Sequence, residues 1–551
     1  MTAPVRTGPE KPDGPGSWPE RPDDQPVNPD PGETGGLEVA GPDQLGGWGG
    51  PERADGASGE KPDGHLPRSG PGGAAWWLRL ATRLGWWVVP AVVLAGFGAA
   101  LVARRHGLWY DELYSAEVAP LPVGDLMRAV VRGEGTLPYL RDAPPSYNAP
   151  YYLVAHLWLA VTGLAADEVG LRVLSLVASV GGLVAATRGV GRLAGRRVAL
   201  VFGLVVAANP FVVEYAVEAR GYGLALLASG LLVLAVARWL ADRPGAAALV
   251  GLAAAGAGLA HWFALLVVGA VAVAAVVLQR RRALGLVVGL GVACLPALAL
   301  VGLAVANGVG GSGAEWIADV GVAVPRLLLR SWTGGSAWLL WPTVGLAAVG
   351  LTLGRGAGRT VAATWLAVPV GLVTLAELVR PVYVDRYLLP ALLGLALLVA
   401  LGATALRPSR LGTVAAAMVV AASAGATFGA QGLGPKEDVR AAVAAVAASH
   451  RPGQPVVAAA RWDALGLDHY ARTDRPGLAA DLVVPPATVP EGASTVWVVR
   501  RTDGGVKGDA DKSAALDRDL EGRGLRRTEE RRFPGRYATT LAQRWDGPGP
   551  G

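Results

Sequence analysis

The sequence predicts an all-α membrane protein that crosses the bilayer many times and ends in a small α/β domain. Hydrophobic residues make up 52% of the 551 residues and charged residues only 17%, a composition too apolar for a soluble protein of this length. About eleven apolar runs reach or approach the ~20 residues that cross the ~30 Å hydrocarbon core of a bilayer. Arginines gather in the short stretches between these runs, which is typical of membrane topology.

Residues 1–74 are rich in Pro, Gly, Asp and Glu and have almost no apolar clusters. Such a segment buries too little apolar surface to offset the entropy of ordering, so the sequence predicts a disordered cytoplasmic segment. It is not a signal peptide, because the first apolar core begins far downstream.

The first apolar run, Trp86–Ala103, would act as an uncleaved anchor that opens a transmembrane domain at residues 80–430. The run at 246–260 is short, and the run at 198–213 is interrupted by Asn209-Pro210. The other predicted spans lie at 170–187, 222–238, 262–279, 284–305, 336–354, 360–379, 387–406 and 411–430.

The arginines orient this domain. With the N-terminus in the cytoplasm, five successive inner loops contain arginines, as the positive-inside rule expects; Arg104 and Arg105 are the exception. The inner arginines are Arg188, Arg192, Arg196, Arg197, Arg238, Arg243, Arg280, Arg281, Arg282, Arg355, Arg359, Arg407 and Arg410.

The same topology places the unusual polar stretches on the outer face. A glycine-rich run at 310–313 opens no helix and predicts a flexible outer loop. Residues 434–551 also fall outside and predict a soluble extracytoplasmic α/β domain. Its expected elements are a helix at 436–449 and strands near 455–460, 481–484, 495–501 and 537–544.

The adjacent carboxylates Asp111 and Glu112, in the sequence Trp109-Tyr110-Asp111-Glu112, are the first candidate site. Carboxylates beside a membrane exit are costly to hold near lipid, and an ionised one can act as a general base. On the dipeptide alone, an ordinary exposed loop is the more frequent case.

Two arginines at the outer mouths of spans are the second candidate. Arg220 follows Asn209-Pro210 and Glu218 and precedes Tyr222, while Arg386 precedes Tyr387. The planar guanidinium binds phosphate in a bidentate manner, although an isolated arginine more often snorkels to lipid headgroups. His261 opens a span at the outer face and is a further pocket candidate. Asn148 and Tyr151 lie in the proline- and tyrosine-rich stretch 144–152, which predicts an outer helix.

Several classes of site are excluded. No phosphate-binding loop, HExxH motif, nucleophile elbow or zinc-ligand spacing occurs. The single cysteine, Cys294, cannot form an internal disulfide or a cysteine metal cluster and reads as a buried apolar residue. The net charge of +6 comes from loop arginines, which does not indicate nucleic-acid binding.

In this order, the motifs resemble those of the polytopic GT-C glycosyltransferases, in particular the family-39-like group. That group includes protein O-mannosyltransferases, the aminoarabinose transferase of lipid A and actinobacterial mannosyltransferases. The resemblance covers about residues 80–430 and rests on Trp109–Glu112, Pro150-Tyr151-Tyr152 with His156 and Trp158, Leu171-Arg172 with Ser175, Asn209-Pro210 to Tyr222, and Asp385-Arg386-Tyr387 with Pro390.

The resemblance implies a multi-pass plasma-membrane enzyme that transfers a sugar, for instance mannose, from a polyprenyl-phosphate donor to an extracytoplasmic glycan, lipid or protein. Asp111 would activate the acceptor hydroxyl for an inverting attack, and Glu112 would position the acceptor or the loop. Arg220 and Arg386 would bind the donor phosphate. The remaining pocket residues would be Tyr222, Tyr387, His261, Glu218, Asn148 and Tyr151.

Many relatives have an acidic residue before the Tyr-Tyr pair, where this chain has Asn148. A divalent metal, Mg²⁺ or Mn²⁺, therefore stays an open expectation. A transporter or lipid flippase is the alternative function, but transporters place ionisable groups at the bilayer midplane, whereas here these groups ring the outer mouth. A scaffold that displays the C-terminal domain would leave Asp111, Arg220 and Arg386 without a purpose.

Overall fold

The computed structural model describes residues 85–308, 317–485, 488–502 and 509–548, all within the second of two compact units, Pro71–Gly551. The disordered segment predicted for residues 1–74 and the flexible loop predicted at 310–313 lie outside the described residues. The predicted fold class is confirmed: a mostly helical polytopic protein with a small C-terminal sheet domain.

Each apolar run of the sequence falls on a helix. The runs at 262–279 and 284–305 both fall on α11, which is kinked at Arg280, where φ is 20°. The helices are α2 (Val88–Ala103), α6 (Glu168–Ala194), α7 (Arg196–Ala208), α9 (Tyr222–Leu240), α10 (Ala246–Ala260), α11 (Leu265–Ala306), α13 (Ala337–Leu353), α14 (Ala357–Glu377), α15 (Leu392–Ala405) and α16 (Ser409–Gln431).

The possible spans can also be counted from the length and composition of the helices. Within the described residues, six helices are long and apolar enough to cross a membrane, or up to eight if each of two bent helix pairs is one span. The bent pairs join α7 to α8 (Pro210–Ala216) at 67°, and the segment Gly321–Trp332, which contains α12 (Val324–Trp332), to α13 at 113°. The sequence-based number of about eleven also includes α2 and α10, which have only 16 and 15 residues, and takes α11 as two helices, in agreement with its break at Arg280.

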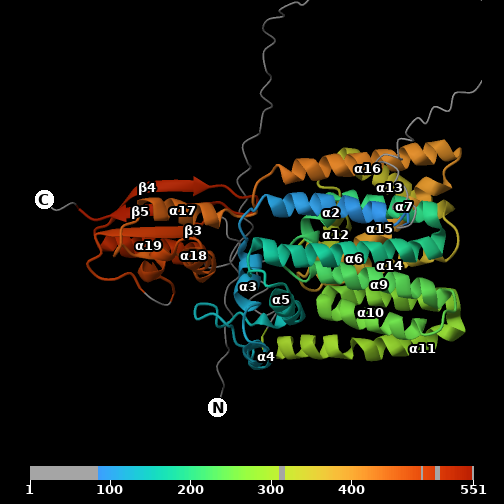
Figure 1. Cartoon of the computed structure of the whole chain (residues 1–551), viewed down its shortest axis with the longest axis horizontal. Coiled ribbons are helices and arrows are strands. Elements are labelled where there is room, and N and C mark those ends of the chain that lie inside the picture. The colour runs from blue at the N-terminus through green and yellow to red at the C-terminus, as the bar shows by residue number, and fades with distance from the viewer. Residues whose placement is uncertain (1–84, 309–316, 486–487, 503–508, 549–551) are drawn as a thin grey trace, which may run out of the picture. The chain divides into compact units, whose positions relative to one another are not determined.

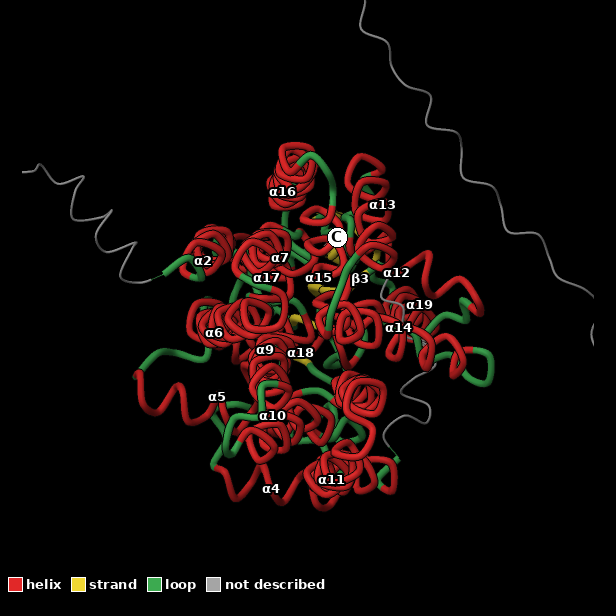
Figure 2. Tube along the Cα trace, turned by 90° about the vertical axis from the view of Figure 1, so that its right-hand side faces the viewer, coloured by secondary structure: helices red, strands yellow, loops and turns green. Residues whose placement is uncertain are grey.

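Glycines let the central helices approach one another closely. A Cβ at Gly230 of α9 would lie 2.0 Å from the carbonyl oxygen of Gly182 in α6, and one at Gly402 of α15 would lie 1.9 Å from that of Leu346 in α13. Small residues of this kind allow close backbone contact between membrane helices, where no hydrophobic force drives association. In Figure 2 these helices are seen nearly end on, with α6 beside α9.

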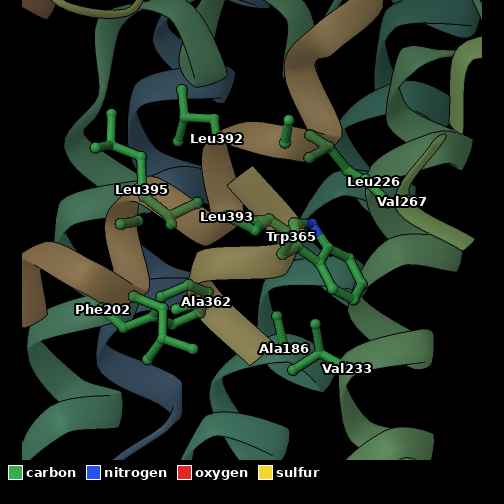
Figure 3. Packing of buried hydrophobic residues seen from close by; sticks show 14 of the residues in the cluster. Ala186, Phe202, Leu226, Val233, Val267, Ala362, Trp365, Leu392, Leu393 and Leu395 are labelled. Carbon is green, nitrogen blue, oxygen red and sulfur yellow. The ribbon is translucent and has the colours of Figure 1, made fainter. Parts of the chain in front are cut away.

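The helical core is organised around α15 and Trp365 of α14. In the segment Asp385–Ala405, 89% of an 18-residue apolar window is buried, the highest share among the candidate spans of the described residues. Figure 3 shows Trp365 near Leu393 of α15 and Leu226 and Val233 of α9, with Phe202 of α7 farther off in the same cluster. Its Nε1 donates a hydrogen bond to the carbonyl oxygen of Pro390 at 2.8 Å. This bond fixes the short 3-10 helix η5 (Asp385–Ala391), which carries Arg386.

The polar stretch after α2 is helical rather than a loop. It forms α3 (Tyr110–Val118), α4 (Val123–Arg132), the 3-10 helix η1 (Pro145–Asn148) and α5 (Ala149–Thr162). The sequence indicated only the last of these as a helix. Asp111 and Glu112 occupy the first turn of α3, where the unpaired N–H groups and the helix dipole favour negative charge. That preference explains a helix start at this point.

The C-terminal domain contains a five-stranded mixed sheet in the order β2-β1-β3-β5-β4. Strand β1 is parallel to β2 and β3, and β5 is antiparallel to β3 and β4. The sequence indicated α17 and four of the strands but not β4, α18 or α19. The elements are α17 (Val439–Ser449), β1 (Val456–Ala458), α18 (Arg461–Thr473), β2 (Leu482–Val483), β3 (Thr495–Arg501), α19 (Asp509–Gly522), β4 (Arg526–Phe533) and β5 (Thr540–Asp546).

Strand β3 divides the apolar residues of this domain between two faces. Val496 and Val498 pack with Leu520 of α19, whereas Trp497 and Val499 point to the other side. That second face belongs to one hydrophobic cluster with α17, α18, α3 and α5, including Leu113. The C-terminal domain is therefore packed directly on the segment that carries Asp111.

Candidate active site

Asp111 lies between two arginines. Its Oδ1 is 3.8 Å from Nη2 of Arg220, and its Oδ2 is 3.6 Å from Nη2 of Arg386. The Asp111 side chain is 13% exposed, so the carboxylate is largely screened from solvent. The three residues come from α3, from the turn between α8 and α9, and from η5. The structure thus brings together the predicted base and both predicted phosphate ligands.

Arg220 is held by residues of η1 and α5. Its Nη1 donates to the hydroxyl oxygen of Tyr152 at 3.0 Å and to the backbone oxygen of Asp111 at 3.4 Å. With the Asn148 amide oxygen turned toward the guanidinium, that oxygen accepts from Nη2 at 2.7 Å. Tyr151 is buried beside Tyr152, with 6.0 Å between the two ring centroids. Asn148 therefore contacts the arginine directly, whereas Tyr151 supports its neighbour.

Arg386 is held by aromatic rings. Its Nε donates to the hydroxyl oxygen of Tyr222 at 3.0 Å. The guanidinium carbon is 5.6 Å from the centre of the Trp109 ring and 5.8 Å from that of Tyr387, within the range of cation–π attraction. Tyr222, at the start of α9, thereby links the two arginine-bearing segments.

His261 lies within the aromatic cluster behind these arginines. Its ring centroid is 5.0 Å from that of Tyr387 and 5.3 Å from that of Tyr222. Nδ1 accepts from the backbone N–H of Phe263, so in the neutral ring the proton lies on Nε2, which is 3.0 Å from the Tyr147 hydroxyl oxygen. Burial, helped by the positive Arg220 and Arg386, lowers the pKa of His261 to about 3. His261 is therefore neutral at physiological pH.

Glu112 points away from Asp111 and forms a buried ion pair. Its oxygens accept from Arg172 at 2.9 and 2.5 Å and from the backbone N–H of Ala219 at 3.0 Å. Burial raises the pKa of this carboxyl, but the charge and hydrogen bonds of Arg172 outweigh burial and leave the pKa below its ordinary value. Both oxygens are engaged, which fits the positioning of the loop rather than of an acceptor.

Glu218 faces the beginning of the C-terminal domain. Its Oε2 accepts from Nζ of Lys436 at 2.5 Å, and Lys436 is also 3.4 Å from Glu214. The Lys436 ammonium lies 4.6 Å from the centre of the Trp109 ring. Burial raises the pKa of Glu218, an effect opposed by the positive Lys436 and Arg386. Glu218 thus pairs with Lys436, which in turn contacts the Trp109 ring.

The C-terminal domain supplies contacts that the sequence did not indicate. Tyr110 lies 5.3 Å from Trp462, centroid to centroid, and 5.3 Å from the Arg501 guanidinium carbon. Trp109 lies 5.7 Å from Tyr537. These three residues are far from α3 in the chain, and aromatic or arginine side chains at a domain surface carry no local pattern that reveals a partner. The domain therefore holds both residues that precede Asp111.

The described residues were also compared with the ligand sets that hold metal ions. No group of three or more His, Cys, Asp or Glu side chains there is placed to hold one. Asp111 faces two guanidinium groups, and Glu112 is paired with Arg172.

The chain has the fold of a multi-pass membrane protein of the GT-C type, as two comparisons with solved structures show. The chain is similar to ArnT from Cupriavidus metallidurans, solved in the apo state and bound to undecaprenyl phosphate. Both comparisons give a TM-score of 0.53 and 14% identity, over 84% and 85% of this chain and 98% of ArnT.

It is also similar to the archaeal oligosaccharyltransferase AglB from Archaeoglobus fulgidus, solved in complex with an inhibitory peptide and a dolichol-phosphate. The TM-score is 0.50 at 10% identity, over 83% of this chain and 74% of AglB. No family model matches the chain, and no curated protein sequence matches it. At these identities the likeness concerns the fold, and the predicted GT-C fold is confirmed.

Proposed function

We propose that this protein is a glycosyltransferase that moves a sugar from a polyprenyl-phosphate donor to an acceptor hydroxyl on the extracytoplasmic side of the membrane. The observation that carries the proposal is the position of Asp111, 3.8 and 3.6 Å from the guanidinium groups of Arg220 and Arg386. A base and a phosphate clamp in contact are the two parts that this reaction needs.

The chemistry follows from these three side chains. The Asp111 carboxylate accepts the proton of the acceptor hydroxyl as its oxygen forms a bond to the anomeric carbon. The bond from that carbon to the phosphate oxygen breaks, with inversion, and the polyprenyl phosphate leaves as an anion. Arg220 and Arg386 stabilise the negative charge that develops on the leaving phosphate. Both arginines are held in place by hydroxyl groups, of Tyr152 and Tyr222 respectively, so little reorganisation is needed.

The structural likeness supports the class of donor. ArnT was solved bound to undecaprenyl phosphate and AglB in complex with a dolichol-phosphate, and both of these ligands are polyprenyl-type phosphates. We extend that class of ligand to this chain. Mannose is our candidate for the sugar, and a glycan, lipid or protein hydroxyl is the acceptor class.

Arginine placement supports an orientation with the N-terminus in the cytoplasm and the C-terminal domain outside. Transport is less well supported, because the charged cluster sits at the ends of helices rather than at their centres. Glu377, the acidic residue nearest to a span interior, accepts hydrogen bonds from the backbone N–H groups of Val320, Val382 and Tyr383. Glu377 is thus used to hold the backbone of two neighbouring loops.

A deletion strain tests the proposal. We expect one polyprenyl-phosphate sugar to accumulate and one surface glycan, glycolipid or glycoprotein to lose that sugar, relative to the parent strain. Complementation with the wild-type gene should reverse both changes, and complementation with an Asp111→Asn variant should reverse neither. Unchanged lipid-linked sugars together with unchanged surface glycosylation would overturn the proposal.

A further inference from the structure

Lys436, in the segment between α16 and α17, places its ammonium group against a tryptophan of the candidate active site. Its Nζ lies 4.6 Å from the centre of the Trp109 ring, within the range of cation–π attraction. The guanidinium carbon of Arg386 lies 5.6 Å from the centre of the same ring. Trp109 is 5% exposed and the Lys436 side chain 10%, so solvent weakens these contacts little. One buried ring is thus shared by Arg386 and by a lysine at the beginning of the C-terminal domain.

The turn between β4 and β5 fixes the backbone at Lys436. The carbonyl oxygen of Lys436 accepts a hydrogen bond from the backbone N–H of Tyr537 at 2.9 Å, and that of Pro435 accepts from Arg536 at 3.0 Å. A Cβ at Gly535 would lie 2.5 Å from the Lys436 carbonyl oxygen, so a larger residue there would push the turn away. The sheet of the C-terminal domain therefore determines the position of Lys436.

Lys436 also holds the carboxylate of Glu218, which is 2% exposed. The ion pair between Nζ and Oε2 of Glu218 measures 2.5 Å. Burial raises the pKa of Glu218, and the positive charge of Lys436 opposes this most strongly, followed by that of Arg386. A buried carboxylate without a counter-charge is strongly destabilised. If Lys436 were lost, Glu214 would keep Arg536 at 3.1 Å, but the next positive group that acts on Glu218 is Arg386.

We propose that Lys436 is a positioning residue for the donor-phosphate site. By pairing with Glu218 it keeps that carboxylate from competing with the phosphate for Arg386. By packing on Trp109 it holds the ring against which Arg386 lies. Lys436 acts through these two side chains and not by contact with the phosphate. The inference rests on the proposed function and gives the C-terminal domain a part in donor binding.

Binding of undecaprenyl phosphate to the full-length protein in micelles, followed by calorimetry, tests this role. Lys436→Met removes the charge and keeps a side chain of similar length, whereas Lys436→Arg keeps the charge. The double variant Lys436→Met/Glu218→Gln also removes the carboxylate that would compete for Arg386. Trp109→Leu is a second route in case Lys436→Met folds poorly, because it removes the shared ring without leaving a buried charge unpaired. Lys512→Met is the matched control, since Lys512 is an exposed residue of α19.

We expect the Kd of Lys436→Met to rise about tenfold, and that of Lys436→Arg to stay within about threefold of the wild-type value. Trp109→Leu should also bind more weakly than the wild type, and Lys512→Met should bind equally well. The double variant should recover most of the affinity, because no carboxylate is left to compete for Arg386. Partial misfolding would lower the fraction of protein that binds and leave the Kd unchanged, so the stoichiometry distinguishes a structural defect from a positioning role.

Two results would overturn the role of Lys436 while leaving the proposed function intact. The first is a wild-type Kd in Lys436→Met, or in Trp109→Leu where Lys436→Met does not fold. The second is a double variant that binds as weakly as Lys436→Met, which would indicate that Lys436 contacts the phosphate itself. Failure of the wild type to bind undecaprenyl phosphate would instead overturn the proposed donor class, and this inference with it.

Discussion

Asp111 and Arg386 lie 3.6 Å apart, although they come from opposite ends of the transmembrane sequence. The same guanidinium that would receive the donor phosphate thus pairs with the base. In the proposed reaction, the donor phosphate would compete with Asp111 for Arg386 and Arg220, because both anions would bind the same two positive charges. We expect donor binding to release the carboxylate for proton transfer.

Asp111→Asn should abolish transfer while leaving expression and membrane insertion intact. The amide keeps the shape of the side chain but cannot accept the acceptor proton, and loss of a general base lowers rates by about 10²–10⁴-fold. Transfer of labelled sugar from a polyprenyl-phosphate donor in isolated membranes measures the effect. Asp125→Asn is the control, because Asp125 is an exposed residue of α4 paired only with Arg128. Full activity in Asp111→Asn would remove Asp111 from the mechanism.

The same substitution should strengthen binding of undecaprenyl phosphate. Without the competing carboxylate, both arginines face the phosphate alone, and we expect about tenfold higher affinity, or about 1.4 kcal/mol. Arg386→Gln should lower the affinity instead, and Arg386→Lys should recover it in part, because lysine keeps the charge but not the planar fork. Exposed Arg326 of α12 offers a neutral control as Arg326→Gln. Calorimetry in micelles distinguishes the cases, and weaker binding in Asp111→Asn would argue against competition.

Glu112→Gln should mainly lower the stability of the protein. The change leaves the Arg172 guanidinium in a buried position without its counter-charge, which costs about 3–5 kcal/mol. Denaturant unfolding in micelles measures the loss. The double variant Glu112→Gln/Arg172→Gln should lose less than the two single variants together, since the pair no longer leaves one buried charge. Strictly additive losses would show that the pair is not coupled.

We expect the free energy of unfolding to fall on mild acidification, because His261 is protonated in the unfolded chain but not in the folded protein. Its pKa in the folded protein is about 3, against 6.5 for the ordinary side chain. Below pH 6.5 the unfolded chain binds a proton that the folded protein does not accept, so stability declines as the pH falls toward 3. The slope approaches about 1.4 kcal/mol per pH unit for this one group.

Thermal unfolding between pH 7 and pH 5 compares the wild type with His261→Gln, which keeps polar groups for Tyr147 and Phe263. The variant should lose less stability than the wild type over this interval. Parallel curves for the two proteins would show that His261 does not titrate between the folded and unfolded states.

Much of the helical region could be predicted from the sequence because a bilayer imposes length and hydropathy on each segment separately. The apolar runs fall on helices, α11 breaks at Arg280 between two of the predicted runs, and α2 and α10 are shorter than the other candidate spans. The β4 strand was missed because its Arg- and Glu-rich sequence lacks the apolar alternation of a buried strand. As an edge strand it needs none, and its charges oppose further pairing.

Most of the predicted site residues lie together in the structure, but Glu112 does not join them. Asp111, Arg220 and Arg386 meet, and Tyr222, Asn148, His261 and Tyr387 surround the two arginines. Glu112 and Asp111 look equivalent in the chain, but consecutive helical positions point in different directions, about 100° apart. One carboxylate therefore faces the arginines of the site while the other is paired with Arg172.

The sequence by itself determined that this is a polytopic helical protein with acidic and basic residues gathered at the ends of its spans. Composition and hydropathy are properties of segments, and each segment satisfies the membrane independently. Only the tertiary structure decided that Asp111 lies between Arg220 and Arg386. It also decided that the C-terminal domain contacts the two residues before Asp111, through Lys436, Trp462 and Arg501. Contacts between distant segments depend on how helices and domain pack, and no local pattern encodes that packing.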